Sequence, residues 1–237
     1  MLFSPQIPLA LEPPRLSRLE DFVPGPNAAV LEALQSVVAE PGSSLFLHGQ
    51  EGSGKSHLLN AVCLRARELG LTAFYLGLRQ PPAEPASALQ GMEAMDLVCI
   101  DDLHCVAGDP AWEEALFHFI NRLRGANGRL VVASHRRLGN LPLRLPDLAS
   151  RLAWGLRLEL KGLDDPDKLQ VLAQHARSLG FELPEDVADF LIRHSDRNVA
   201  RLLALVDRLR YRAFTEKRRI TVPLARAVMG EPVTRDA

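Results

Sequence analysis

The sequence predicts an α/β domain built on a parallel sheet of five strands, followed by a small helical domain. Short apolar runs alternate with helical patterns from about Pro26 onward, which is typical of a parallel sheet with helices on both faces. A glycine-rich loop of the pattern G-x-x-x-x-G-K-[ST] joins the first apolar run to the helix after it. Beyond Lys161 the strand patterns stop and only helical patterns remain.

Turn and capping signals delimit the elements of the first domain. Asn27 is a candidate N-cap for a helix whose apolar face includes Val30 and Leu34, and a Pro-Gly pair stops that helix. Gly70 ends a second helix and Pro110 opens a third. The predicted helices cover residues 28–40, 55–69 and 110–125, and the predicted strands cover residues 44–48, 72–76, 97–100, 130–133 and 155–160.

The second domain has helical signals alone. Asp164 and Pro166 are typical of an N-cap and a first helical turn, and Gly180 ends that helix. Three more helices are predicted, over residues 184–194, over residues 199–217 and after Pro223. The predicted organisation is an extended proline-rich tail over 1–20, an α/β nucleotide-binding domain over 21–162 and a helical lid over 163–237, without internal repeats.

Composition excludes several classes of protein. The 237 residues are 47% hydrophobic and 24% charged, which excludes a mostly disordered chain. Lys and Arg number 28 against 29 Asp and Glu, so the chain has no excess of basic residues. We therefore expect no direct sequence-specific DNA binding. No apolar run approaches the roughly 20 residues of a membrane span, and the first residues do not form a signal peptide. These features predict a cytoplasmic protein without a membrane partner.

The glycine-rich loop is predicted to bind phosphate, and the alternative is a glycine turn that happens to contain Lys-Ser. Its glycines let successive backbone N–H groups curl around a phosphate, and the helix N-terminus adds positive potential. We expect Lys55 to reach the β- and γ-phosphates and the Ser56 hydroxyl to bind Mg²⁺. Glu51 fits only if its carboxylate points away from the anion. The loop consists of Gly49, Gln50, Glu51, Gly52, Ser53, Gly54, Lys55 and Ser56.

A second acidic signal follows the apolar strand over residues 97–100. Such a loop requires a neighbouring strand that ends in an acid near the magnesium ion. Asp101 directly ends the strand and is the candidate Mg²⁺ ligand, whereas Asp102 is a candidate to orient the attacking water. The alternative is a pair of surface aspartates that open a turn.

Arg151 lies between leucines just before the last predicted strand. An arginine at the edge of one subunit can neutralise transition-state charge on a nucleotide bound by its neighbour, which can be worth about a thousandfold or more in rate. The alternative is a surface residue with a buried aliphatic stem. Trp154, close by, fits a contact residue or a core residue equally well.

Together these segments resemble the AAA+ ATPases and, within them, the DnaA family of bacterial replication initiators. The resemblance implies an AAA+ fold, a segment around Val23 that leads into an adenine pocket, and nucleotide binding by His57 in the helix after the phosphate loop. It also implies a sensor 1 at Ser134, a Walker B motif at Asp101 and Asp102, and an arginine finger at Arg151. It is carried by residues 22–27, 54–59, 100–102, 133–134, 150–156 and 197–202.

Two departures from the initiator pattern affect the expected function. The sequence has no counterpart of the initiator's C-terminal helix-turn-helix domain, in agreement with its neutral charge. In the sensor 2 motif Ala200 stands at the place of the nucleotide-contacting arginine and Arg201 follows it. One step along a helix turns a side chain by about 100°, so Arg201 is either a displaced nucleotide contact or a surface residue.

The N-terminal tail contains a segment that resembles the motif by which proteins dock on the replicative sliding clamp. The glutamine amide can satisfy polar groups at a pocket rim, the leucines can fill an apolar cavity, and proline lowers the ordering entropy of the peptide. The alternative is a tail that folds back over its own domain. The candidate clamp-binding residues are Gln6, Ile7, Pro8, Leu9 and Leu11.

An initiator-like AAA+ domain with such a tail resembles the Hda family of DnaA-homologous regulators. This resemblance implies a nucleoid-associated activator that, bound to the DNA polymerase III sliding clamp (its β subunit), stimulates hydrolysis of DnaA-bound ATP through Arg151. Its own ligand is expected to be ADP, ATP or another nucleoside diphosphate with Mg²⁺, with weak or no turnover. A homodimer that masks Arg151 is left open. A helicase-loader-like AAA+ ATPase and a small-molecule kinase are the alternatives.

Overall fold

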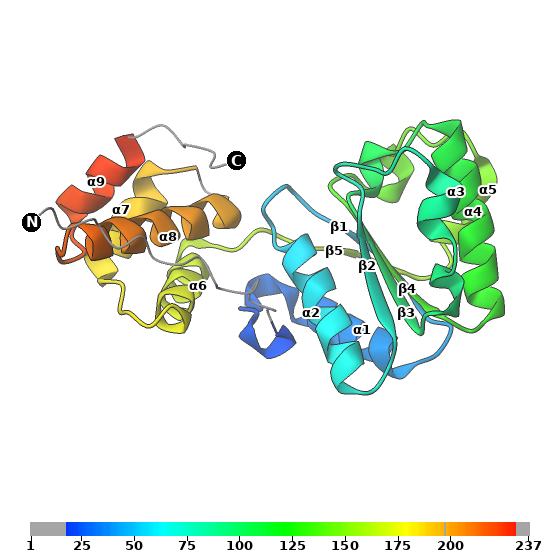
Figure 1. The fold of residues 1–237 in the computed structure, drawn as a ribbon, viewed down its shortest axis with the longest axis horizontal. Coiled ribbons are helices and arrows are strands. Elements are labelled where there is room, and N and C mark those ends of the chain that lie inside the picture. Colours follow the sequence, from blue (N-terminus) through cyan, green and yellow to red (C-terminus); the bar gives the residue numbers. More distant parts are fainter. Residues whose placement is uncertain (1–17, 197, 231–237) are drawn as a thin grey trace, which may run out of the picture.

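A five-stranded parallel sheet forms the centre of the larger lobe, which we call the base (Figure 1). The structure is a computed structural model that describes residues 18–196 and 198–230. The strand order is β2-β3-β4-β1-β5. The strands are β1 (Ser44–His48), β2 (Ala73–Gly77), β3 (Leu97–Asp101), β4 (Arg129–Ser134) and β5 (Leu156–Glu159).

The position of β1 determines where the phosphate loop lies. β1 pairs in parallel with β4 on one side and with β5 on the other, so the loop after His48 leaves from the carboxyl edge of the sheet. The turn after β3 leaves from the same edge. Every residue of β3 and β4 is buried, because helices cover both faces of the sheet. The predicted parallel sheet is confirmed. Each observed strand end lies within one residue of the predicted end.

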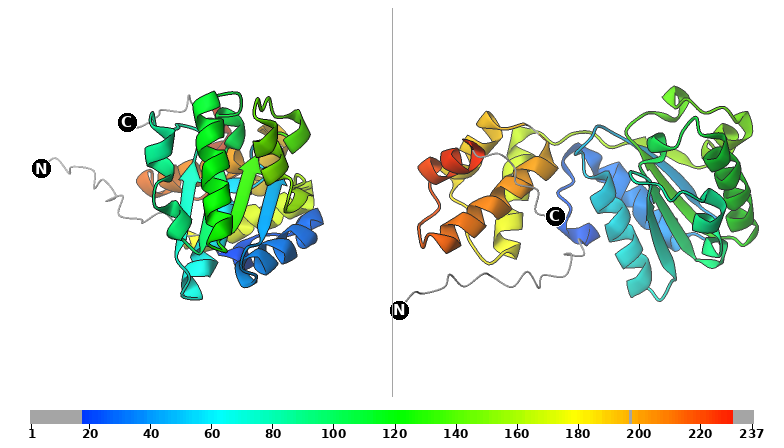
Figure 2. Two further views of the ribbon diagram at one scale, coloured as in Figure 1. Left: turned by 90° about the vertical axis from the view of Figure 1, so that its right-hand side faces the viewer. Right: turned by 45° about the horizontal axis from the view of Figure 1, so that its top comes forward.

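Helices cover both faces of the sheet (Figure 2). Their apolar side chains form two cores, one on each face. α1 (Ala28–Ala39) and α2 (Lys55–Glu68) cover one face. α3 (Pro85–Leu89), α4 (Pro110–Gly125) and α5 (Pro146–Leu152) cover the other, where Phe46, Phe119 and Leu148 lie almost completely buried. The short helices α3 and α5 were not predicted from the sequence.

The second lobe, the lid, consists of helices around a third core. The carboxylate of Asp164 accepts a hydrogen bond from the Asp167 N–H at 2.8 Å, which confirms the predicted N-cap. A row of apolar residues that includes Leu172, Leu191 and Val206 fills the centre. The lid helices are α6 (Asp165–Ser178), α7 (Glu185–His194), α8 (Val199–Thr215) and α9 (Val222–Gly230).

Asn27 connects the start of α1 to the segment that leads to the lid. Its side chain does not cap α1. Instead, its amide nitrogen donates to the Lys161 carbonyl at 3.1 Å and its amide oxygen accepts from the Lys161 N–H at 2.8 Å. The expectation that the Asn27 side chain caps the helix was therefore wrong, because two long-range hydrogen bonds use the whole amide.

Two further predictions concern the N-terminus and membranes. Leu19, assigned to the extended tail, is buried against the base core, and Leu19–Asp21 form a short 3-10 helix. The clamp-binding candidates Gln6, Ile7, Pro8, Leu9 and Leu11 lie outside the described residues. Within the described ranges, none of the helices has the length and apolarity that a membrane crossing requires.

Candidate functional site

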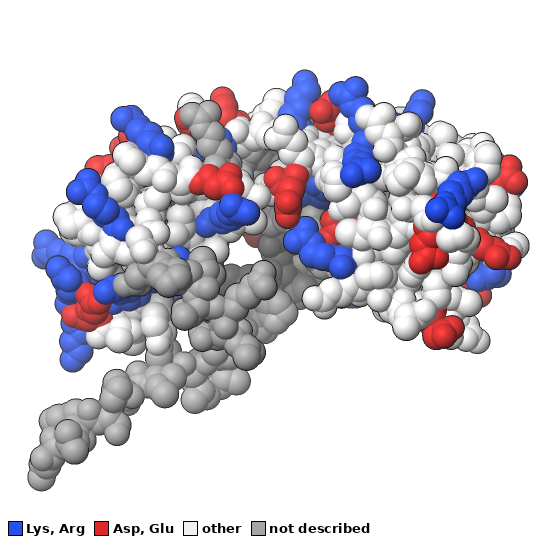
Figure 3. Space-filling model, turned by 90° about the horizontal axis from the view of Figure 1, so that it is seen from above, with Lys and Arg blue, Asp and Glu red and all other residues white. Residues whose placement is uncertain are grey.

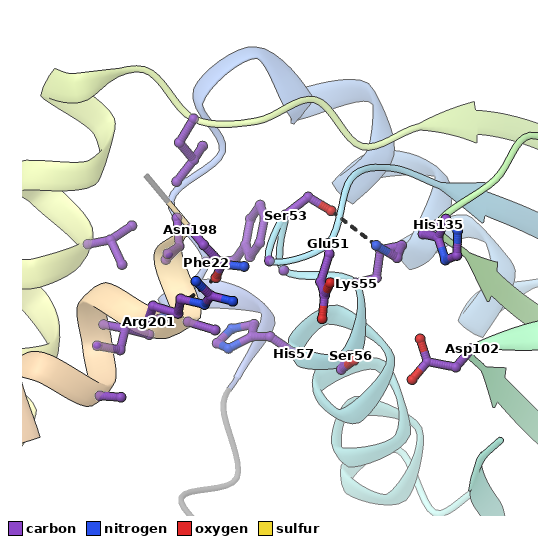
Figure 4. A pocket seen from close by; sticks show the side chains of 18 of the residues that line it. Phe22, Glu51, Ser53, Lys55, Ser56, His57, Asp102, His135, Asn198 and Arg201 are labelled. Atoms are coloured by element: carbon purple, nitrogen blue, oxygen red, sulfur yellow. Dashed lines mark hydrogen bonds between the residues drawn. The ribbon is translucent and has the colours of Figure 1, made fainter. Parts of the chain in front are cut away.

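A cleft of about 1120 Å³ separates the base from the lid. Figure 3 shows the two lobes with a hollow between them and charged side chains at its rim. The phosphate loop, the end of β2, the turn after β3 and the first turns of α8 contribute to its walls. The residues labelled in Figure 4 are Phe22, Glu51, Ser53, Lys55, Ser56, His57, Asp102, His135, Asn198 and Arg201.

The loop backbone has the conformation that an anion site requires. Gly52 and Gly54 have φ angles of 77° and 100°, which side chains with a Cβ rarely adopt. A Cβ on Gly52 would overlap the Asn198 amide, and one on Gly54 would lie 3.1 Å from the Phe22 ring. α2 starts at Lys55 without a side-chain cap, so its first N–H groups are free to donate to a phosphate.

The side chain of Lys55 is buried and folds back onto the phosphate loop. Its ammonium group donates to the carbonyls of Gly49 and Gln50 at 2.7 and 2.8 Å, and to Ser53 Oγ at 3.4 Å. Burial lowers the pKa of Lys55, while the carboxylates of Asp101 and other acids oppose this effect. The charge is therefore held at the loop, within reach of a ligand in the cleft.

Asp101 is completely buried at the end of β3. One carboxylate oxygen accepts from the Tyr75 hydroxyl at 2.9 Å and the other accepts from the Asp102 N–H at 2.8 Å. Burial, the Asp101 charge and this hydrogen bond raise the pKa of Tyr75. Asp101 does not line the cleft, so its role as a Mg²⁺ ligand stays a prediction. Sequence reasoning missed Tyr75, and no local signal marks it.

Asp102 lines the cleft and has a left-handed backbone, with φ of 55°. Arg79 bridges its carboxylate and that of Glu51, at 3.3 and 3.4 Å. Glu51 is mostly exposed, and its pairing with Arg79 explains how the loop tolerates an acid. Sequence reasoning also missed Arg79, because it lies in an irregular segment with no motif.

The segment before α1 forms an apolar wall of the cleft. Val23 is buried, and the rings of Phe22 and His57 lie with centroids 5.7 Å apart. Burial lowers the pKa of His57, which favours the neutral imidazole, and its Nε2 is buried without a hydrogen-bond partner among the described residues. An apolar wall with one unsatisfied ring nitrogen is a suitable environment for a nucleobase.

The lid contributes the first turn of α8. The Asn198 side chain accepts from the Arg201 N–H at 3.3 Å and thus caps the helix, while it also lies against Gly52. Arg201 lines the cleft, but its guanidinium forms an ion pair with Asp196 on the same lobe. Arg201 therefore fits both interpretations: its place at the cleft suits a displaced nucleotide contact, and its exposure and its ion pair suit a surface residue.

The residues after β4 differ in their access to the cleft. Ser134 is completely buried, and its hydroxyl accepts from the Arg136 N–H at 3.0 Å. Its neighbour His135 lines the cleft and contacts His104 with ring centroids 3.7 Å apart. Ser134 therefore stays a predicted sensor without direct access, and His135 is a cleft residue that sequence reasoning missed.

Arg151 lies far from this cleft. It occupies the last turn of α5, and its neighbours in a shallow hollow include Ser44, at the beginning of β1. The phosphate loop follows the opposite end of β1, a strand of five residues that spans roughly 13 Å. Arg151 is half-buried and its guanidinium stacks 3.9 Å from the ring centroid of Trp154.

These residues fit a nucleoside phosphate. The uncapped start of α2, the left-handed glycines and the buried Lys55 suit the phosphates, and the wall beside His57 suits the base. For Mg²⁺, Ser56 and Asp102 line the cleft together, which is the oxygen donor set that this ion prefers.

Two family descriptions match the chain. The bacterial DnaA ATPase domain matches residues 84–159, which include β3, β4, α5 and β5. The Hda lid domain matches residues 165–229, which cover the whole described lid apart from its last residue. The two matches are consecutive, and they fall on the two lobes that the structure separates.

Solved structures show the same fold. Domain III of the replication initiation protein DnaA from Thermotoga maritima has a TM-score of 0.80 and 24% identity, over 92% of this chain and 98% of that chain. AMPPCP-bound DnaA from Aquifex aeolicus has a TM-score of 0.70 and 23% identity, over 85% and 67%. The Holliday junction branch migration motor RuvB of T. maritima has a TM-score of 0.66 and 21% identity, over 85% and 66%. The predicted AAA+ fold with a helical lid is confirmed.

Proposed function

Because the chain is an Hda-like, DnaA-homologous AAA+ protein, we propose that it stimulates the hydrolysis of ATP bound to the initiator DnaA. Arg151 supplies a positive charge to the initiator's nucleotide across the boundary between the two proteins. In this mechanism the initiator becomes ADP-bound and inactive, which prevents repeated initiation of replication.

The position of Arg151 carries this proposal. Arg151 lies near the amino end of β1, whereas the chain's own phosphate loop lies at the carboxyl end, so Arg151 cannot reach a nucleotide in its own cleft. Within the part of the chain that the structure describes, Arg151 has no ion pair and its Nε has no hydrogen-bond partner. An arginine left without an acid at an accessible edge is suited to an anion that another molecule supplies.

The chain's own cleft has a different role in the proposal. It binds ADP, ATP or another nucleoside diphosphate with Mg²⁺ as a ligand that stabilises the arrangement of base and lid. Lys55 and the start of α2 bind the phosphates, Ser56 with Asp101 or Asp102 binds the ion, and Val23, His57 and Arg201 face the nucleoside side. Turnover is weak, because Arg201 is paired with Asp196 and the candidate finger Arg151 lies away from the cleft.

The tail links this activity to replication. We propose that Gln6, Ile7, Pro8, Leu9 and Leu11 bind the DNA polymerase III sliding clamp on DNA. Binding to the clamp would bring the protein to the nucleoid and raise its effective concentration near the initiator without any new contact between them. The partners are thus the initiator DnaA and the clamp, without a direct contact to a DNA sequence.

The decisive experiment measures initiator ATP hydrolysis with DNA-loaded clamp and either wild type or Arg151→Ala. We expect the variant to lose about a thousandfold of the stimulation, the typical value of an arginine finger. Arg193→Ala is the matched control, since Arg193 is an exposed lid arginine paired with Asp189. Stimulation at the wild-type rate by Arg151→Ala would refute the proposal.

A second experiment tests the tail separately from the finger. Gln6→Ala and Leu9→Ala should lose capture by immobilised clamp while keeping nucleotide binding in the cleft. If both variants still bind the clamp, the tail has no part in it. Capture of a replicative helicase instead would favour the helicase-loader alternative.

A further inference from the structure

Trp154 contacts a second arginine besides Arg151. The guanidinium carbon of Arg124 lies 3.7 Å from the ring centroid of Trp154, and that of Arg151 lies 3.9 Å from it. Arg124 belongs to the last turn of α4 and Arg151 to the last turn of α5. One indole, 48% exposed, therefore holds two cations from two different helices.

The charges of this cluster are not balanced by the protein. Neither Arg124 nor Arg151 forms an ion pair among the residues of 18–196 and 198–230, whereas Arg122, two positions earlier on α4, pairs with Glu93 at 3.3 Å. The carbonyl ends of α4 and α5 and the indole face offset part of the repulsion between two guanidinium groups. The cluster thus concentrates positive charge and lacks an anion.

The surface around the cluster is open. A hollow of about 190 Å³ lies beside Trp154. Residues at the amino ends of β1 and β4 also line it. Gly42, Ser43, Ser44 and Gly128 line one part of it, whereas the side chains of Ile120, Leu123 and Leu130 line another, so the small residues leave room beside the two guanidinium groups. An extended anion such as a polyphosphate can therefore lie across both arginines.

We propose that Arg124 and Arg151 together bind the polyphosphate of the nucleotide held by the adjoining initiator, and that Trp154 positions both guanidinium groups. This inference rests on the proposed function, because it takes the anion from the initiator's ATP. Arg124 becomes a second catalytic residue, and Trp154 is a positioning residue.

The reaction explains why a second cation is useful. During hydrolysis a water oxygen bonds to the γ-phosphorus while the bond to the β,γ-bridging oxygen breaks, and the water proton passes to solvent. Negative charge grows on the bridging oxygen and remains on the γ-oxygens. A cation near each set of oxygens lowers the barrier more than one cation shared between them.

Arg124→Ala tests the second cation, in the assay of initiator ATP hydrolysis with DNA-loaded clamp. We expect the maximal stimulated rate to fall about tenfold, while clamp capture stays unchanged. Arg122→Ala is the matched control on the same helix and should keep the wild-type rate, since Arg122 is already paired. A wild-type rate for Arg124→Ala, with activity lost in Arg151→Ala, would overturn the inference and leave the proposed function intact. A wild-type rate for Arg151→Ala would overturn the proposed function itself.

Trp154 needs a test that separates positioning from stability. Trp154→Ala should lower the maximal rate about as much as the loss of Arg124, whereas Trp154→Phe, which keeps an aromatic face, should restore most of it. Thermal unfolding of both variants, measured in parallel, should differ little, because the indole is half exposed. Equal rates for Trp154→Ala and wild type would refute a positioning role, as would a loss that follows the unfolding temperature alone.

Discussion

The interlobe cleft and the α4–α5 edge both present cations to solvent, yet they hold them in different ways. In the cleft, Lys55 donates to two loop carbonyls and Arg79 is shared between Glu51 and Asp102. At the edge, Arg124 and Arg151 lie against an indole, and neither pairs with a carboxylate of the residues that the structure describes. The cleft is therefore electrostatically satisfied before a ligand arrives, whereas the edge requires an anion from outside.

Removing one cation from each region, by Lys55→Ala in the cleft and Arg151→Ala at the edge, gives the largest expected difference in nucleotide affinity. Lys55→Ala should weaken nucleotide binding in the cleft by about a hundredfold, because a charged donor to the phosphates is lost. Arg151→Ala should leave that affinity unchanged. Isothermal titration calorimetry with ADP and Mg²⁺ measures the affinity of both variants. A loss of affinity in Arg151→Ala would show that the two regions are not independent.

The support of α5 by α4 is the next target. Glu113 is buried, and its carboxylate accepts hydrogen bonds from the N–H groups of Gly108, Arg144 and Leu145 at 2.7 to 3.1 Å. Glu113→Ala leaves these donors unsatisfied in the segment before α5, so we expect a loss of about 3 kcal/mol of unfolding free energy. Urea denaturation measures it.

Glu114→Ala is the matched control for this prediction. Glu114 is the adjacent residue of α4, and its exposed side chain has a weak ion pair with His118 at 3.9 Å. We expect a change within about 0.5 kcal/mol. If Glu113→Ala were equally mild, the segment before α5 would be held by other contacts than this carboxylate.

The sequence predicts the cleft better than the edge, for physical reasons. Apolar runs and glycine spacing are local signals, so β1, the glycine turn after it and α2 were predicted correctly. α3 and α5 were missed, because five and seven residues are too few for a clear helical period. The role of Arg151 as an arginine finger was predicted from the resemblance to the DnaA family and not from a local signal.

Partners that depend on tertiary structure could not be predicted from the sequence. Asn27 has the appearance of an N-cap, but its amide binds Lys161, which is 134 residues away. Asp101 was assigned to Mg²⁺, yet its visible partners are Tyr75 and the neighbouring backbone. The stacking of Arg124 on Trp154 requires that two helix ends and the start of β5 meet, which no spacing reveals.

The half-buried His57 of the cleft predicts a pH dependence that the edge should lack. Burial lowers the pKa of His57 in the folded state. Below the unfolded value of about 6.5, the unfolded chain therefore binds a proton more readily. The unfolding free energy should fall as the pH drops below about 6.5, until the folded pKa is reached. His57→Gln should reduce this slope in urea denaturation.

The exposed His118 on α4 is the matched control for the pH experiment. His118→Gln should leave the slope of the unfolding free energy with pH unchanged. An unchanged slope in His57→Gln would mean that other histidines, such as His48 and His104, whose pKa values burial also lowers, carry the dependence.

Arg201 should give the smallest effect. Its guanidinium is exposed and paired with Asp196, so its removal costs little binding energy. We expect Arg201→Ala to weaken ADP binding by about threefold at most in the same calorimetric titration. A loss as large as that of Lys55→Ala would identify Arg201 as a direct phosphate contact.

The two hydrogen bonds of Asn27 determine where the lid can bend. They fix Lys161 to the start of α1, so any rotation of the lid has to begin after Lys161, and at Gly162 a Cβ would meet no atom within 4 Å. Because that pivot lies after β5 and away from α4 and α5, swinging of the lid transmits little strain to Trp154. If the cleft exchanges a nucleotide as proposed, the arginine pair keeps its geometry whether the lid is open or closed.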